Sequence, residues 1–492
     1  MKFRTQSKKS NWILIKSTAM KYRVESDLIG ELQVPEEAYY GVQTQRAVEN
    51  FQISGVLLSG FPQFIKGLAY VKWAAAETNF TLGLLDENIK NAIVEASKEV
   101  IDGKFDHDFP LDMIQGGAGT STNMNINEVI ANRANEMMGY SKGSYEVVTP
   151  NDHVNLSQST NDAYPTAIKI AAIATNQQLV TVLQQLIQSL RAKAESFRNV
   201  IKMGRTQLQD AVPMTLGQEF EAFAVSLEDD IERLNQSALL LLDINMGATA
   251  IGTGLNAAPG YATLCAENLS IITGYKFKTA RNLIEATPDT GAYVSYSSAL
   301  KRMAVKISKI CNDLRLLSSG PRCGFNEINL PAMQPGSSIM PGKVNPVIPE
   351  VMNQICFKVI GNDLTVTLAA EAGQLQLNVM EPVMIFSILE SMMLLSNGMQ
   401  TLATKCVDGI TANEAHCKAM VMNSIGIVTA LNPYIGYKNS TKIAKEALET
   451  GTSVYDLVIK YNILSMEEMD RILDPENMLA PQMEKVNHHP NK

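Results

Sequence analysis

The 492-residue sequence has few of the residues that build metal centres and disulfide frameworks. It contains five His, and no pair of them has the HxxxH or HExxH spacing that places two imidazoles on one helix face. Its six Cys include no CxxC pair, so neither a thiolate zinc site nor a redox dithiol is indicated. We therefore predict no metal site, and we interpret the Cys as free thiols in a reducing, cytoplasmic environment.

Charged residues are also scarce, at 19% of the chain against about 25% in typical soluble domains. The 42 Lys and Arg are outnumbered by 50 Asp and Glu, which gives a formal net charge of −8. An acidic chain lacks the basic surface that nucleic acids and acidic lipid headgroups require. No segment has the roughly 20 consecutive apolar residues of a membrane span. We expect neither a nucleic acid nor a membrane as a partner.

The first 19 residues differ from the rest of the chain. They carry five basic residues and no acidic one, as the start of a signal peptide does, but their apolar run, WILI, has only four residues. That run is shorter than the about 7–15 apolar residues of a signal peptide. We interpret residues 1–19 as an N-terminal extension, which is either a disordered tail or the result of an upstream start codon.

Helical periodicity dominates the rest of the sequence. In 86–103, Ile89, Ile93, Ala96 and Val100 recur at helical spacing before Gly103, a typical C-cap residue. Five much longer helical patterns cover 165–200, 215–243, 292–318, 348–378 and 382–404. These patterns predict a mainly α fold built around a long five-helix bundle.

Charged residues are thin in 348–404, so these helices lack a continuous solvated face. We expect them to be covered by other subunits of an oligomer. The predicted domains are an N-terminal helical domain at 20–160, a central bundle at 161–410 and a small C-terminal domain at 411–492.

Four loops rich in Gly, Pro and small polar residues interrupt the helical patterns. Their candidate functional residues are Thr120 in 116–128; Ser159, Thr160 and Asn161 in 150–166; Thr206 and Gln207 in 204–220; and Ser337, Ser338, Lys343 and Asn345 in 336–346. Taken singly, each loop is explained by an ordinary helix N-cap or a surface turn. Together they offer many neutral hydrogen-bond donors and few charges, which suits a small dicarboxylate bound without a metal.

The loop GSSIMPGKVNP at 336–346 resembles the signature loop of the aspartase/fumarase superfamily. The likeness extends over nearly the whole chain from about Met20 onward, through AYYGVQTQRAVENF at 38–51, GTGLN at 252–256 and QLQLNVMEP at 374–382. Within the superfamily, RNLIEAT at 281–287 and GITAN at 409–413 are most similar to the bacterial aspartate ammonia-lyases, or aspartases.

The resemblance implies a three-domain subunit whose long helices form a homotetrameric core, with each active site shared by three subunits. It also implies reversible elimination of ammonia from L-aspartate to give fumarate. No cofactor is expected, although the sequence leaves activation by a divalent cation open.

The resemblance also implies a role for each candidate residue. Ser337 is the base that removes the Cβ proton and leaves an enediolate-like intermediate. The β-carboxylate is held by Thr120, Ser159, Thr160 and Ser338, the amino group is surrounded by Asn161, Thr206 and Gln207, and the α-carboxylate is addressed by Lys343 and Asn345.

These roles agree with the chemistry of the reaction. A proton beside a carboxylate is very weakly acidic, because its removal places a second negative charge on that group, so donors aimed at the oxygens must supply most of the stabilisation. A Ser hydroxyl is a poor base unless its alkoxide is stabilised. We hypothesise that backbone amides of 336–342 and Lys343 stabilise it.

The nearest alternative function is class II fumarate hydratase, which shares the loop and interconverts fumarate and L-malate. Fumarases of this type carry His where this chain has Gln207, and His where it has Thr149. Elimination of water needs a proton for a poor leaving group, whereas ammonia leaves from an ammonium that is already protonated. Both differences favour the ammonia-lyase, although some aspartases keep the second His.

Two further alternatives are less well supported. The argininosuccinate and adenylosuccinate lyases have a catalytic His that Gln207 does not match. An inactive structural or binding descendant of the fold is disfavoured, because drift without catalysis would be expected to damage some of the polar loop positions, and these are intact.

Overall fold

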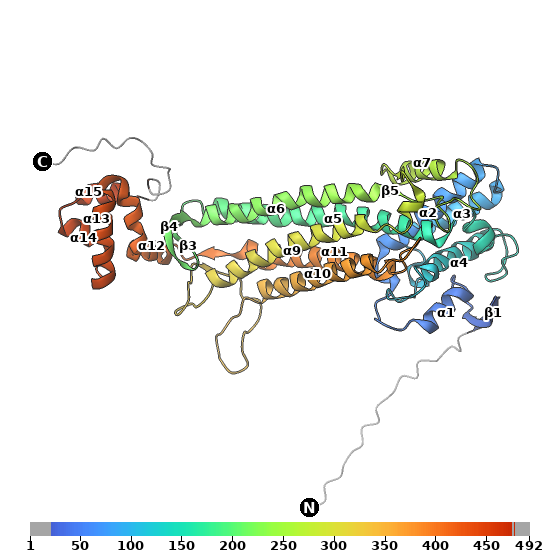
Figure 1. Ribbon diagram of the computed structural model, residues 1–492. Helices are drawn as coiled ribbons and strands as arrows, with labels where there is room; N and C mark the ends of the chain where they lie inside the picture. The colour runs from blue at the N-terminus through green and yellow to red at the C-terminus, as the bar shows by residue number, and fades with distance from the viewer. Residues whose placement is uncertain (1–20, 475–476, 478–492) are drawn as a thin grey trace, which may run out of the picture. The chain divides into compact units, whose positions relative to one another are not determined.

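The computed structural model describes residues 21–474 and 477, and it is mainly helical (Figure 1). The predicted extension at 1–19 lies outside the described residues. The α-helices are α1 (Val42–Asn50), α2 (Pro62–Thr81), α3 (Glu87–Ile101), α4 (Thr120–Met137), α5 (Thr160–Ser196), α6 (Leu216–Leu239), α7 (Tyr261–Thr273), α8 (Leu283–Ala286), α9 (Gly291–Leu317), α10 (Val347–Glu371), α11 (Glu381–Lys405), α12 (Glu414–Asn423), α13 (Val428–Thr450), α14 (Val454–Lys460) and α15 (Met466–Ile472).

The strands are short. They are β1 (Tyr22–Asp27), β2 (Gly30–Pro35), β3 (Ile201–Thr206), β4 (Gln209–Thr215), β5 (Asp243–Ile244), β6 (Lys278–Thr279), β7 (Ile328–Asn329) and β8 (Thr411–Ala412). Antiparallel pairing joins β1 to β2, β3 to β4 and β7 to β8. The fold is therefore mainly α, as predicted.

Contacts divide the chain into two compact units. Unit 1 comprises Asn245–Leu283 and the described part of Met1–Ala167, and unit 2 comprises Ile168–Ile244 and the described part of Ile284–Lys492. The three-domain division predicted from the sequence stays a prediction.

In unit 1, α2 packs against α3 and α7, and α4 packs against α1 and α3. The buried Glu128 of α4 organises the start of α1, because its carboxylate accepts hydrogen bonds from the backbone N–H groups of Gly41, Gln43 and Thr44. These N–H groups have no partner within the helix, so the carboxylate serves as the cap that α1 itself lacks.

In unit 2, the long helices run side by side, with α9 packed against α6, α10 and α11 (Figure 1). Buried polar bonds join α5 to the same bundle: Asn176 donates to Asn235 of α6 and accepts from the Tyr296 hydroxyl of α9. The five-helix bundle predicted from periodicity is confirmed.

The expected helix at 348–378 is seven residues too long, because α10 ends at Glu371. The side-chain amide of Asn378 donates to the carbonyls of Ala369 and Ala370 at the end of this helix, while its oxygen accepts from the N–H of Met380. A side chain that satisfies terminal carbonyls in this way ends a helix whose apolar pattern continues.

The long helix α5 begins at Thr160, five residues before Pro165, which we expected to open it. Pro165 has no N–H to donate to the carbonyl of Asn161, four residues earlier. That carbonyl accepts a hydrogen bond of 2.9 Å from the side-chain amide of Asn245 instead. A tertiary contact therefore allows the helix to run through the proline.

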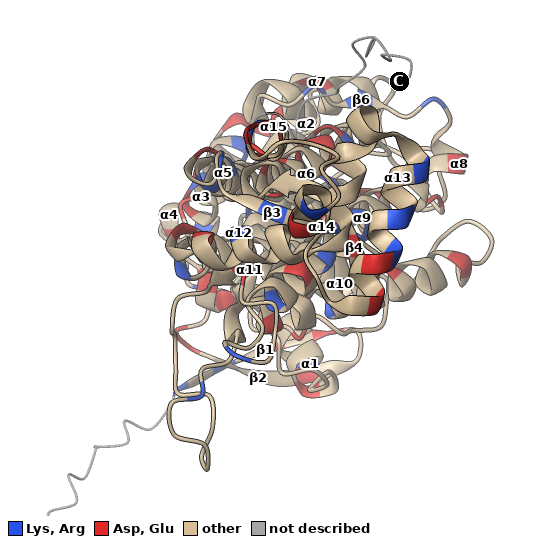
Figure 2. Cartoon of the chain, turned by 90° about the vertical axis from the view of Figure 1, so that its left-hand side faces the viewer, with Lys and Arg blue, Asp and Glu red and all other residues tan. Residues whose placement is uncertain are grey.

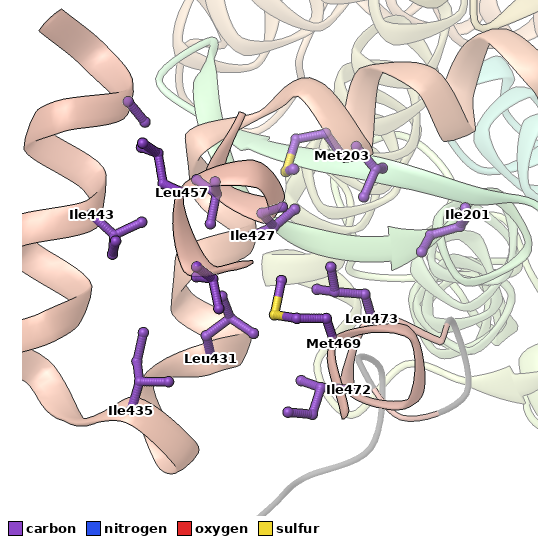
Figure 3. Close-up of a cluster of buried hydrophobic side chains, with 14 residues drawn as sticks. Ile201, Met203, Ile427, Leu431, Ile435, Ile443, Leu457, Met469, Ile472 and Leu473 are labelled. Atoms are coloured by element: carbon purple, nitrogen blue, oxygen red, sulfur yellow. The ribbon is translucent and has the colours of Figure 1, made fainter. Parts of the chain in front are cut away.

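The C-terminal helices surround a hydrophobic cluster of their own within unit 2 (Figure 3). Leu431 and Ile443 of α13, Leu457 of α14 and Met469 of α15 are fully or almost fully buried in it. Met203 of β3 packs into the same cluster, so the β3–β4 hairpin is anchored to these helices.

One described stretch, Glu381–Gly409, is long and apolar enough to cross a membrane by composition, with a mean hydropathy of 1.3. This corrects the expectation that no segment would qualify. Since 61% of its most apolar 18-residue segment is buried inside the molecule, the stretch is a core helix of the bundle. Core helices of this kind also reach the length and hydropathy of a membrane span.

The close approach of α2 to Ala167 gives a test of the packing in unit 1. A Cβ on Gly67 would lie 2.5 Å from the Ala167 carbonyl oxygen, which is backbone and cannot rotate away. We predict that Gly67→Ala lowers the free energy of unfolding by about 1–3 kcal/mol in urea titrations. Gly60→Ala is the control, because a Cβ there meets nothing within 4 Å and should change stability by less than about 0.5 kcal/mol. Equal effects of the two changes would contradict the packing.

Candidate active site

The first turn of α4 presents Thr120 at an exposed position. The preceding Gly119 has a φ of 85°, and a Cβ there would lie 2.6 Å from the ring of Tyr164. Only glycine meets both demands, so the turn that starts this helix requires the glycine before Thr120.

The start of α5 places Ser159, Thr160 and Asn161 in one tight turn. The carboxylate of Asp162 closes it by accepting a 2.9 Å hydrogen bond from the Ser159 N–H, and the Ser159 hydroxyl accepts from the N–H of Asn161. The Thr160 hydroxyl accepts a 3.2 Å bond from the amide of Asn123, which lies on the first turn of α4. The structure thus brings the two predicted loops of unit 1 together.

Asp162 also holds a second loop against this turn. Its other oxygen accepts hydrogen bonds from the N–H groups of Gly247 and Thr249, and Asn161 donates to the Ala250 carbonyl. Asp162 is completely buried, and burial raises the pKa of its carboxyl to about 6, although the backbone donors and the nearby Lys72 act in the opposite direction.

The β3–β4 hairpin of unit 2 carries Thr206 and Gln207 at its exposed tip. Gln207 and Leu208 form its two-residue turn with φ values of 54° and 62°. Non-glycine residues are strained in this left-handed region, and such strain is concentrated at functional sites. The sequence pattern predicts these residues ahead of a helix and does not predict the hairpin.

A buried ion network fixes the base of this hairpin. The carboxylate of Glu327, which is fully buried, pairs with both Lys202 and Arg205 of β3. The Arg205 guanidinium also lies 4.2 Å from the ring centroid of Phe325. The strained tip is therefore displayed from a rigid support.

The loop at 336–346 is closed by hydrogen bonds between its ends. The Gly336 N–H donates to the Lys343 carbonyl at 2.7 Å, and the Asn345 side chain donates to the Gly336 carbonyl at 2.8 Å. Inside the loop, the Ser337 hydroxyl oxygen accepts from the N–H groups of Ile339 and Met340, at 3.2 and 3.0 Å. Ser338 and Lys343 are exposed.

Two N–H donors on one hydroxyl oxygen favour its deprotonated form, because they stabilise the negative charge of an alkoxide. The same contacts occur in ordinary serine turns, and stabilisation of the alkoxide is what a serine base would require.

The structure places the candidates in three groups. Thr120, Ser159, Thr160 and Asn161 form one group in unit 1, whereas Thr206 with Gln207, and Ser337 with Ser338, Lys343 and Asn345, form two separate loops in unit 2.

Sequence reasoning missed two supporting residues, Asp162 and Lys72. Each is a charged residue inside or beside an apolar helical pattern, in STNDAY and YVKWAAA, and that isolation is the signal by which they are recognisable. Within the described residues, no group of three His, Cys, Asp or Glu is placed to hold a metal ion.

Comparison with protein families agrees with the helical bundle and the polar loops. A family model described as Lyase matches residues 30–361, and one described as Fumarase C C-terminus matches residues 427–480. The chain belongs to this lyase family, within the aspartase/fumarase superfamily.

Within that class, the relatives of this chain include aspartate ammonia-lyases. The aspartate ammonia-lyase of Helicobacter pylori is 59% identical over 93% of this chain and 98% of its own length. That of Escherichia coli is 55% identical over 93% of this chain and 96% of its own length.

Two solved structures show the same fold. A fumarate lyase:delta crystallin from Brucella melitensis bound to cobalt is 54% identical, covers 94% of this chain and all of its own, and superposes with a TM-score of 0.91. A class II fumarase from Schistosoma mansoni is 38% identical, with the same coverage and a TM-score of 0.88.

The raised pKa of Asp162 makes a prediction about stability. Because the folded chain holds this proton more tightly than the unfolded chain, whose carboxyl has the ordinary pKa of 3.8, the stabilisation is present at low pH and is lost as the pH rises through about 6. Asn cannot ionise, so Asp162→Asn should gain stability relative to wild type between about pH 4.5 and about pH 7.5. Urea unfolding at both pH values measures this difference, and a relative loss in place of the gain would contradict it.

Proposed function

We propose that the chain catalyses the reversible elimination of ammonia from L-aspartate to give fumarate. Relatives that are 55–59% identical over nearly their whole length are aspartate ammonia-lyases. The observation that carries the mechanism is the Ser337 hydroxyl, which accepts two backbone N–H bonds inside the signature loop.

In the first step, the Ser337 alkoxide removes a proton from Cβ. The electrons of the broken C–H bond move into the adjacent β-carboxylate, which becomes an enediolate with two negative charges. In the second step these electrons form the Cα–Cβ double bond, and the Cα–N bond breaks to release ammonia. Ser337 then loses its proton to solvent.

The donors of unit 1 suit the charge that develops on the β-carboxylate. Thr120, Ser159 and Thr160, together with Ser338, are proposed to hold its oxygens. One such donor is worth about 10²–10³ in rate at comparable oxyanion sites. Asp162 fixes the turn that carries these neutral donors, so they need no reorganisation while the charge develops. Their hydrogen bonds therefore stabilise the intermediate more than the substrate.

The other candidates serve the remaining groups of the substrate. Asn161, Thr206 and Gln207 are proposed to surround the amino group, and Lys343 and Asn345 to address the α-carboxylate. The proposed base and the proposed hydrogen-bond donors are all groups of the chain itself, so the mechanism is proposed to need no cofactor, and activation by a divalent cation stays open.

We infer that the chain forms a homotetramer in which each site combines residues of three subunits. On α10, Phe357, Gly361, Leu364 and Leu368 lie on one face, and the three large side chains are 59–60% exposed. Helix α13, in contrast, shows both basic and acidic residues (Figure 2). An apolar helix face this open is typical of a subunit interface, and a second copy of the chain is its proposed occupant.

Free, mostly buried Cys agree with a cytoplasmic location.

Class II fumarate hydratase is the second candidate, since the S. mansoni fumarase shares the fold at 38% identity. Its identity is well below that of the ammonia-lyases, and the hairpin presents Gln207 where that reaction calls for a proton donor.

The substrate prediction is direct. Purified enzyme should form fumarate, followed by its ultraviolet absorbance, from L-aspartate and not from L-malate. Ser337→Ala should lower kcat by at least about 10³-fold, because the base is lost. Ser141→Ala, at an exposed serine outside the candidate site, should keep full activity. Fumarate from malate alone, or a fully active Ser337→Ala variant, would overturn the proposal.

The assembly prediction uses the apolar face of α10. Leu364→Lys should dissociate the tetramer, since it buries charge in an apolar interface, and light scattering should show smaller, inactive species. Leu448→Lys makes the same change at a leucine of α13 that is 74% exposed and should leave mass and activity unchanged. A tetrameric Leu364→Lys variant would exclude this face as the interface.

A further inference from the structure

The Lys72 side chain of α2 is completely buried in unit 1. Its ammonium donates to three neutral amide oxygens, those of Asn123 at 2.7 Å, Gln158 at 2.8 Å and Asn155 at 3.1 Å. Burial lowers the pKa of the Lys72 amine to about 7. The three acceptor oxygens satisfy all of its N–H groups and favour the charged form, which burial disfavours.

A continuous hydrogen-bonded path runs from this ammonium to a candidate substrate contact. The Asn123 oxygen accepts from Lys72, and the nitrogen of the same amide donates to the Thr160 hydroxyl oxygen at 3.2 Å. Asn123 is itself buried, with 1% of its surface exposed. Since the Thr160 oxygen already accepts this bond, its own hydrogen is left to donate to a ligand.

The charge acts on this path by polarisation. A cation on the amide oxygen draws electron density from the amide nitrogen, which makes its N–H a stronger donor. The stronger donor in turn makes the Thr160 O–H a stronger donor to any carboxylate beyond it. In a buried, low-dielectric setting such effects are larger than in water.

We propose that Lys72 is a positioning residue of the elimination reaction, which acts through Asn123 to orient and polarise the Thr160 hydroxyl toward the enediolate form of the β-carboxylate. This inference rests on the proposed function for the role of Thr160. The neutral donors proposed for the β-carboxylate thereby gain the effect of a positive charge without placing a cation in contact with that carboxylate.

The proposal predicts an effect on turnover and little effect on substrate binding, because the dianionic intermediate gains more from a stronger donor than the substrate does. Lys72→Met, which keeps the length of the chain and removes the charge, should lower kcat by about 10–100-fold and change KM by less than about threefold. The control is Ser157→Ala, in the loop that also carries Asn155 and Gln158. It removes the buried hydrogen bond from Ser157 to Asn79 and should leave kcat within about twofold.

A double-mutant cycle separates this role from a structural one. Thr160→Val should itself lower kcat, and in that background Lys72→Met should cost no more than about twofold further, because the hydroxyl through which it acts is gone. Independent, multiplicative losses, or a Thr160→Val variant with wild-type kcat, would overturn the proposal.

Asn123→Asp provides a second variant in case Lys72→Met does not fold. The carboxylate keeps and strengthens the bond to Lys72, yet it has no N–H to donate to Thr160. We expect a folded variant with kcat lowered by about 10-fold or more, and full activity would contradict the proposal. The series is run on whichever of L-aspartate and L-malate the wild-type enzyme converts, so failure of the substrate assignment is distinguished from failure of the Lys72 role.

Discussion

The buried carboxylate of Asp162 is the interaction on which the candidate site of unit 1 depends. Its oxygens accept the N–H groups of Ser159, Gly247 and Thr249, so one side chain fixes both the turn at the start of α5 and the loop that lies against it. A donor that is already aimed at the developing charge needs no rearrangement during the reaction. The arrangement of Ser159, Thr160 and Asn161 therefore follows from a charge that is completely buried.

Buried charges support two of the three groups of candidate residues. Lys72 donates to three side-chain amides, one of which donates to Thr160. Glu327 pairs with Lys202 and Arg205 at the base of the hairpin whose strained tip carries Gln207. Each charge has its partners inside the protein, so the residues presented to a ligand are mainly hydroxyls and amides. Such a site suits a substrate that carries two negative charges and gains another during the reaction.

The sequence was sufficient for the long helices, because an apolar face repeated over more than 20 residues leaves few alternatives. It misplaced the start of α5 and the end of α10, where Asn245 and Asn378 make tertiary or local bonds to helix carbonyls that no periodicity contains. The loop residues were recognised through their motifs. The hairpin at Gln207 was missed because its turn has no Gly or Asn, the usual residues of such turns.

The supporting residues were harder to predict for the same reason. Lys72 and Asp162 lie 90 residues apart in sequence. Only the fold shows that Lys72 is linked to Thr160 through Asn123, and that Asp162 binds the neighbouring Ser159. A lone charge in an apolar helix marks such a residue, but it does not identify what the charge holds in place. Motifs thus indicate the groups that contact a substrate, whereas packing determines the groups that orient them.

For a site that combines residues of several subunits, we propose that Thr160 and Ser337 come from different subunits, and subunit complementation tests this most directly. Thr160→Val and Ser337→Ala chains, each nearly inactive alone, would be dissociated, mixed in equal amounts and reassembled. We expect the mixture to regain about a quarter of the wild-type activity, because about that share of sites would combine an intact Thr160 with an intact Ser337. A mixture no more active than its two components would contradict a site shared between subunits.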